Sequence, residues 1–173
     1  MTPSKTNRVR LAPVFGMDPE TRSALANLEA LAKSAKVAVA GRFMPDAQVS
    51  ERLADKGIAE DVEEADFFRY SRVVIPFSGV SPVRRKAWEK AGVPLADLTS
   101  PQVRRAQVAL GLLRLDGAQP LVIGRHSDAE SRALAEGNPG TRILEDTTDT
   151  PRLAFAPVFG GVGQPTLSPG RGS

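Results

Sequence analysis

The stretch RVVIPFSGVSPVRRKAWEKAGVPLADLTSPQV (residues 72–103) decides the fold. It begins with a β-branched run that predicts a buried strand, and SGVSP then forms a turn. Residues 83–92 predict a helix with Trp88 on its apolar side. A short strand at 93–96 and the start of a second helix follow. Strand, helix and strand in this order are typical of a parallel βαβ unit.

The same alternation extends on both sides of this stretch. Hydrophobic spacing and capping residues predict strands at 9–15, 36–40, 121–124 and 142–145, and helices at 19–36, 47–57, 102–115 and 128–136. Strands that alternate with helices of about ten to fifteen residues favour a doubly wound α/β fold. We therefore expect parallel sheets with helices on both faces, and ligands at the carboxyl ends of the strands.

Length and composition predict how the chain is organised. Its 173 residues, 41% hydrophobic and 25% charged, are typical of a globular protein. The pentapeptide APVFG occurs at 12–16 and again at 156–160, which either a pseudo-repeated fold or coincidence would explain. We expect an N-terminal tail at 1–8, a first α/β unit at 9–70, a second at 71–146, and a final strand with a Gly-, Pro- and Ser-rich tail at 147–173.

The absence of cysteine excludes more kinds of site than any other feature of the composition. A chain without cysteine has no disulfide, no thiolate ligand for zinc or an iron–sulfur cluster, and no cysteine nucleophile. His126 is the single histidine, so a site with several histidine ligands is also excluded. We therefore expect no cofactor and no bound metal.

Charge and hydropathy predict where in the cell the protein is located and which classes of partner it binds. The net charge of +3 comes from basic residues spread along the chain, which predicts no nucleic-acid partner. No apolar run approaches the roughly 20 residues of a membrane span. The basic and then apolar N-terminus is not followed by a small-residue cleavage site. These features predict a cytoplasmic protein with no transmembrane segment.

The loops, in this order, resemble those of the LytB (IspH) family, the 4-hydroxy-3-methylbut-2-enyl diphosphate reductases. GVSP followed by DLTSP is similar to the AHGVSP and DATCP loops of the family. VIGRHSDAE at 122–130 is similar to its GHPE loop, and GRFMPD at 41–46 to its HExVHN segment. The resemblance covers about 9–146 and implies parallel sheets built from pseudo-repeated βαβ units.

Departures from the family pattern are as informative as the matches. The resemblance implies three cysteines that hold an iron–sulfur cluster; the first would fall near Gly16, the second on Ser100, and the third in a later domain. The family's histidines, which meet the substrate diphosphate, fall on Pro45, Ser78 and Asp128. Only the proton-delivering glutamate has a counterpart, in Glu130. Serine cannot replace a cluster thiolate, so we expect the reductase activity to be lost and the chain not to be an enzyme.

Three hypotheses about function follow. The first is a non-catalytic LytB-like protein that acts as an interaction or structural subunit of a larger assembly with protein partners. The alternative is a sensor that binds a small molecule, either phosphate or an isoprenoid diphosphate. The third is an enzyme with unrelated chemistry that uses His126 and Glu130 as acid and base.

The candidate site residues fall into two groups. Ser81 and Ser100 each precede a proline, which favours helix N-caps, although hydroxyls at helix N-termini can also donate to a phosphate. The candidate ligand-binding residues are Ser78, Gly79, Ser81, Thr99, Ser100 and Glu130. The candidate partner-binding residues are Phe67, Phe68 and Tyr70, which are either core residues or an exposed patch.

Overall fold

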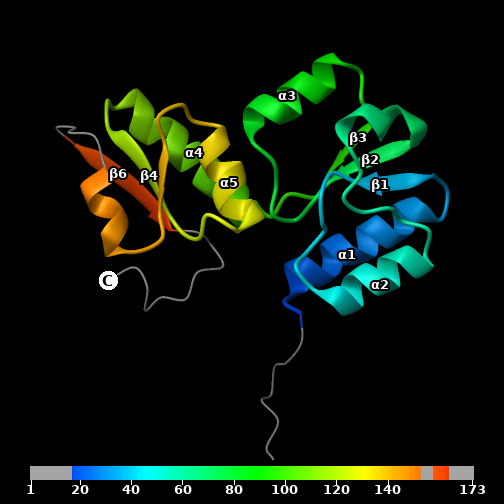
Figure 1. Ribbon diagram of the computed structural model, residues 1–173. Coiled ribbons are helices and arrows are strands. Elements are labelled where there is room, and N and C mark those ends of the chain that lie inside the picture. Colours follow the sequence, from blue (N-terminus) through cyan, green and yellow to red (C-terminus); the bar gives the residue numbers. More distant parts are fainter. Residues whose placement is uncertain (1–16, 153–157, 164–173) are drawn as a thin grey trace, which may run out of the picture.

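The computed structural model describes residues 17–152 and 158–163, which form two parallel sheets with helices packed against them (Figure 1). The elements of the first sheet and its helices are α1 (Pro19–Ala32), β1 (Val37–Val39), α2 (Ala47–Asp55), the 3-10 helix η1 (Glu64–Arg69), β2 (Arg72–Ile75), α3 (Pro82–Lys90) and β3 (Leu95–Asp97). Those of the second are α4 (Pro101–Leu115), β4 (Gln119–Ile123), α5 (Ala129–Glu136), β5 (Arg142–Leu144), the 3-10 helix η2 (Thr147–Arg152) and β6 (Phe159–Gly163).

All strand pairs are parallel, and the strand order is β1-β2-β3 in one sheet and β5-β4-β6 in the other. The α/β fold predicted from the sequence is therefore confirmed. Each predicted helix and strand within the described residues has a counterpart, with ends that differ by a few residues. The strand expected at 9–15 and the first copy of APVFG lie outside the described residues.

Helices cover both faces of the first sheet because successive strand residues point to opposite sides. Val74 packs with Leu25 and Leu28 of α1 and Leu53 of α2. Its neighbours in β2 pack on the other side, where Phe67 and Trp88 make an edge-to-face contact with ring centres 5.2 Å apart. The core therefore continues through the sheet.

The second sheet has its own core. Val122 of β4 packs with Val103 and Leu110 of α4 and with Leu134 of α5, and all four side chains are fully buried or nearly so. In Figure 1, α4 and α5 lie beside β4 and β6. None of the helices in the two described ranges is long and apolar enough to cross a membrane.

The pairing of the strands differs from the division expected at residue 70/71. β2 and β3, which the sequence assigned to the second α/β unit, pair with β1, so the break between the two sheets falls in the loop from β3 to α4. The physical reason is that β1, β2 and β3 are joined by crossover connections that return each strand to the edge of the same sheet, a long-range pairing that local patterns do not specify. How the chain divides into independently folding parts stays a prediction.

Candidate functional site

The FSGVSP loop after β2 and the DLTSP loop after β3 meet at the carboxyl edge of the first sheet. Gly79 has a φ of 73°, and a Cβ added there would lie 2.8 Å from Thr99 Cγ2 and 3.1 Å from Val103 Cγ1. Only glycine combines that backbone conformation with so close an approach. Gly79 thus lets one loop pack directly against the other, as the order of the strands predicts.

Ser81 and Ser100 cap the helices that leave these loops. Ser81 Oγ accepts a hydrogen bond of 3.2 Å from the Arg84 N–H, and Ser100 Oγ accepts one of 3.1 Å from the Val103 N–H. Both serines are buried. The capping interpretation is therefore confirmed, and each hydroxyl oxygen already has a partner in its own helix.

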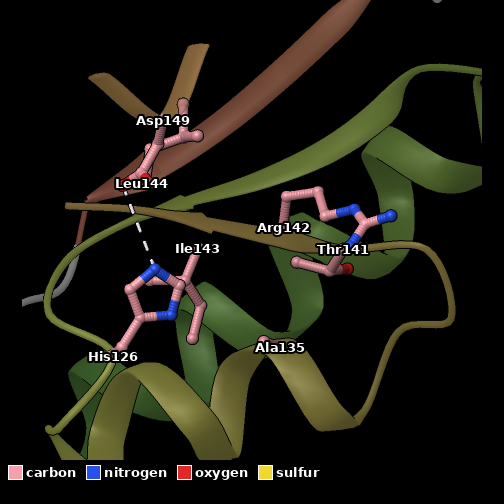
Figure 2. Close-up of a pocket in the computed structure, with 7 residues that line it drawn as sticks. All are labelled: His126, Ala135, Thr141, Arg142, Ile143, Leu144 and Asp149. Atoms are coloured by element: carbon pink, nitrogen blue, oxygen red, sulfur yellow. Dashed lines mark ion pairs between the residues drawn. The ribbon is translucent and has the colours of Figure 1, made fainter. Parts of the chain in front are cut away.

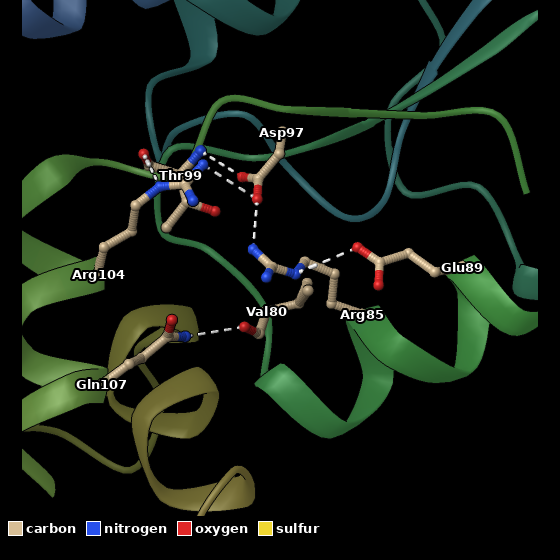
Figure 3. Close-up of polar contacts among 7 residues, drawn as sticks. All are labelled: Val80, Arg85, Glu89, Asp97, Thr99, Arg104 and Gln107. Atoms are coloured by element: carbon tan, nitrogen blue, oxygen red, sulfur yellow. Dashed lines mark hydrogen bonds and ion pairs between the residues drawn. The ribbon is translucent and has the colours of Figure 1, made fainter. Parts of the chain in front are cut away.

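Asp97, at the end of β3, holds together two arginines from different helices (Figure 3). Asp97 Oδ2 lies 2.9 Å from Arg85 Nη1 of α3 and 3.0 Å from Arg104 Nη2 of α4. Its other oxygen, Oδ1, accepts a 3.0 Å hydrogen bond from the Thr99 N–H. Gln107 of α4 also donates a 2.9 Å hydrogen bond to the Val80 carbonyl. These contacts fix α3, α4 and both loops relative to one another.

The environment of Asp97 favours its charged form. Burial raises the pKa of Asp97, but the hydrogen bonds from Thr99 and Arg85 and the charge of Arg104 together lower it by more. The net effect is a pKa below the ordinary value for an aspartate. Arg85 Nε also lies 3.5 Å from Glu89 Oε1, so the two guanidinium groups are balanced by the two carboxylates of Asp97 and Glu89.

Two cavities border the loops. The first, of about 340 Å³, lies between α3 and α4 and is lined by Val80, Pro82, Arg85, Thr99, Arg104, Gln107 and Val108. The second, of about 420 Å³, lies beside α1 and is lined by Pro19, Glu20, Ser23, Ala24, Asn27, Phe77, Asp97, Leu98, Thr99 and Pro101. Of the predicted ligand-binding residues, Thr99 alone lines both. The arginines make the first cavity the better environment for an anion.

The remaining predicted ligand-binding residues are placed differently. Ser78 lies in the turn after β2 and is half-buried. Glu130 lies in the first turn of α5 and is only 7% exposed. It is not among the residues that line either cavity.

His126 belongs to a separate cavity of about 330 Å³ in the second sheet (Figure 2). His126 Nε2 lies 3.9 Å from Asp149 Oδ2, and its backbone N–H donates a 3.3 Å hydrogen bond to Glu145 Oε2. The cavity runs along β5 past Ile143 and Leu144 toward Thr141. Glu130 does not line it, so the structure provides no pairing of His126 with Glu130 there.

The three aromatic residues of η1 and its end do not form one exposed patch. Phe67 is 1% exposed and belongs to the core with Trp88, so it is not available to a partner. Tyr70 is half-buried, and its ring lies 4.8 Å from Lys36 Nζ. Phe68, at 64% exposed, is the one that points outward. The short 3-10 helix sends adjacent side chains in different directions, and no spacing in the sequence revealed this.

The charged residues of the site, Asp97, Arg85 and Arg104, are not among those predicted from the sequence. The signal for the arginines was present, because Arg85 and Arg104 each lie four residues after a capping serine, at the same position of two helices that leave adjacent strands. Asp97 ends the strand beside them. No cluster of histidine, cysteine, aspartate or glutamate side chains suited to a metal ion occurs in the part of the chain that the structure describes.

Comparison with known proteins finds one family and relatives that share one name. The LytB protein family matches residues 16–171. The 4-hydroxy-3-methylbut-2-enyl diphosphate reductase of Oleidesulfovibrio alaskensis is 33% identical over 98 residues, which are 57% of this chain and 35% of the relative. The reductase of the same name from Geobacter sp. strain M21 is 26% identical over 157 residues, 89% of this chain and 54% of the relative.

Solved structures share the fold. The E-1-hydroxy-2-methyl-but-2-enyl-4-diphosphate reductase from Plasmodium falciparum superposes with a TM-score of 0.80 at 21% identity, over 90% of this chain and 51% of that one. A structure of (E)-4-hydroxy-3-methyl-but-2-enyl diphosphate reductase gives a TM-score of 0.74 at 21% identity, over 90% and 57%. The chain thus spans about a third to somewhat more than half of the length of the proteins it matches.

The names of these relatives contradict the prediction that the chain is not an enzyme, because all are named reductases. That prediction is wrong in its reasoning: ligands missing from one chain do not show that a reaction is lost. The residues of this chain show only which ligands of an iron–sulfur cluster are missing. The chain has no cysteine, and the hydroxyl of Ser100 serves as a helix cap. These residues do not fit a cysteine-held iron–sulfur cluster.

Proposed function

The chain belongs to the LytB protein family, and from this premise we propose that it acts as an interaction subunit of a larger cytoplasmic assembly, docked through one face of α4. The observation that carries the proposal is an exposed apolar face. Val108, Leu112 and Leu115 are 63%, 56% and 84% exposed, and we name these three residues the α4 stripe.

The three residues of the α4 stripe are spaced so that they lie side by side on one face of the helix. Positions four and seven residues after Val108 lie on the same side of a helix. The opposite side of α4 carries Val103 and Leu110, which are buried against the second sheet. Single exposed apolar residues are ordinary, but an apolar row on the outer face of a helix indicates a contact with another molecule.

We propose that any reductase activity is carried out by the assembly and not by this chain alone. The relatives are named for the reduction of a diphosphate compound, and a complex that contains this chain is the material in which to test for that activity. Because this chain has no cysteine, any thiolate ligand in such a complex would come from a different protein and not from a second copy of this chain.

The proposal is tested by the native mass of the tagged chain in gently lysed host cells. We expect a particle clearly heavier than the 18.4 kDa chain, and we expect Leu115→Glu to release the chain from it. Val83→Glu is the matched control, because Val83 is 59% exposed but lies on α3, outside the α4 stripe. A particle that is equally heavy with both variants, or no particle at all, would refute docking through α4.

A second candidate function is favoured by the cavity between α3 and α4. Arg85 and Arg104 line it while Asp97 and Glu89 do not, and guanidinium groups bind phosphate with paired hydrogen bonds. We propose that this cavity binds a small phosphorylated molecule, such as the diphosphate for which the relatives are named.

Calorimetric titration with pyrophosphate and with 4-hydroxy-3-methylbut-2-enyl diphosphate tests this binding. Arg85→Gln should weaken it, whereas Arg84→Gln should not, because Arg84 pairs with Glu64 and does not line the cavity. Equal effects of the two variants, or no heat of binding to the parent chain, would count against the ligand.

A further inference from the structure

No contact within the described part of the chain accounts for a glycine at position 111, in the middle of α4. Gly111 lies three residues after Val108 and four before Leu115, which places it on the same face as the α4 stripe. A Cβ added there would have no atom within 4 Å. Glycine in the middle of a helix weakens the helix, so a residue with a side chain would be more favourable for this chain by itself.

A glycine at the centre of an apolar helix face suits a second helix that crosses it closely. The distance between two packed helices depends on the side chains at their contact, and small residues allow the closest approach. The apolar residues around Gly111 would then surround the crossing point. This explains both the exposed stripe and the glycine within it.

We propose that the occupant of this face is α4 of a second copy of the chain, running antiparallel and crossing at Gly111. The inference rests on the proposed function, since it names the partner of the α4 stripe. A two-fold axis through the crossing point makes the contact self-complementary. Val108 then lies near Leu115 of the second copy, and Leu112 lies near its own counterpart at the axis.

The charges beside the α4 stripe select the antiparallel arrangement. Arg105 and Asp116 are eleven residues apart, about three helical turns, so both flank the stripe on the same side. Arg105 lies six residues before Gly111, and Asp116 lies five residues after it. A two-fold axis at Gly111 therefore sets each Arg105 opposite Asp116 of the second copy.

The alternative orientation is disfavoured by the same residues. In a parallel pair in register, the two-fold axis runs along the helices and places the flanks that carry Arg105 and Asp116 on opposite sides of the contact, so no Arg105 meets an Asp116. Within the described ranges, the side chains of Arg105 and Asp116 make no ion pair, so both are available for this contact.

The first test is sedimentation of the purified full chain over a range of concentrations. We expect a species of twice the 18.4 kDa chain mass that dissociates on dilution. Gly111→Leu should weaken the dimer at least tenfold while leaving the isolated chain folded, because there is open space around Gly111. Val83→Glu should leave the dimer unchanged.

A second test measures the geometry. The natural chain has no cysteine, so Leu112→Cys introduces the only thiol, and mild oxidation should join two copies through it. Arg114→Cys, on the flank of the same helix, should not cross-link. Arg105→Asp and Asp116→Arg should each weaken the dimer, and the double variant should restore it.

The outcomes separate this inference from the proposed function. A chain that stays monomeric at all concentrations, or a dimer that Gly111→Leu does not weaken, overturns the self-pairing. If the monomeric chain still enters a heavier particle that Leu115→Glu disrupts, the proposed function stands with an unlike partner. If neither a dimer nor such a particle forms, both fail.

Discussion

Gly79 and Gly92 have nearly the same backbone conformation and different surroundings. Their φ angles are 73° and 76°, in the left-handed region that favours glycine. A Cβ on Gly79 would lie 2.8 Å from Thr99 Cγ2, whereas a Cβ on Gly92 would have no atom within 4 Å. At Gly79 the side chain is therefore excluded by the neighbouring loop as well as by the backbone.

This contrast predicts different costs for the same substitution. Gly92→Ala should lower the free energy of unfolding by about 1–2 kcal/mol, the cost of a left-handed alanine. Gly79→Ala should cost about 1–3 kcal/mol more, because the packed loops must separate. Urea unfolding of both variants measures the difference, and equal costs would mean that the contact between the two loops contributes nothing.

At the scale of elements, Asp97 joins the beginnings of α3 and α4 to the end of β3. Thr99, Arg104 and Arg85 lower the pKa of Asp97 by more than burial raises it. Because this pKa is lower in the folded than in the unfolded chain, the ionised carboxylate stabilises the fold. That contribution is complete above the ordinary aspartate pKa of about 3.8 and is lost as the pH falls through the lower folded value.

Asp97→Asn should therefore remove part of the stability at pH 7, about 1.5–3 kcal/mol for hydrogen bonds to a charged group. It should also flatten the fall in stability below about pH 4, because the group that takes up the proton is gone. Unfolding free energies measured between pH 3 and pH 7 test both effects. Asp55→Asn, on the exposed side of α2, is the control for the loss of one negative charge. If the unfolding free energy of Asp97→Asn fell with decreasing pH as steeply as that of the parent chain, the role of Asp97 would be contradicted.

At the scale of the whole molecule, two sheets have separate cores. Leu28 packs with the first sheet and Leu134 with the second, and both are fully buried. The loops around Asp97 and the hydrogen bond from Gln107 to Val80 connect the two parts. Local stability is therefore expected to follow the sheet to which a residue belongs.

Leu134→Ala and Leu28→Ala form a matched pair, each expected to cost about 2–5 kcal/mol of local stability. With Leu134→Ala, amide hydrogens of β4 should exchange faster while those of β2 remain protected. Leu28→Ala should produce the reverse pattern. Hydrogen exchange followed by mass spectrometry distinguishes the two sheets, and loss of protection in both sheets with either variant would show a single cooperative unit.

The sequence by itself determined the elements and the fold class, because both depend on local signals. Helical spacing, strand runs, and caps such as Ser81 and Ser100 act within a few residues, and the structure confirms them. The order of strands and helices likewise predicted parallel pairing. The GVSP and DLTSP motifs identified the family that the match over residues 16–171 supports.

Tertiary structure alone decided which side chains meet. The pairing of Asp97 with Arg85 and Arg104 requires two loops to converge from adjacent strands, and burial separates Phe67 from its exposed neighbour Phe68. The assignment of β2 and β3 to the first sheet also depends on long-range pairing. The exposed face of α4 is visible only once its opposite face is seen packed on the second sheet, because hydrophobic spacing does not say which apolar residues remain uncovered.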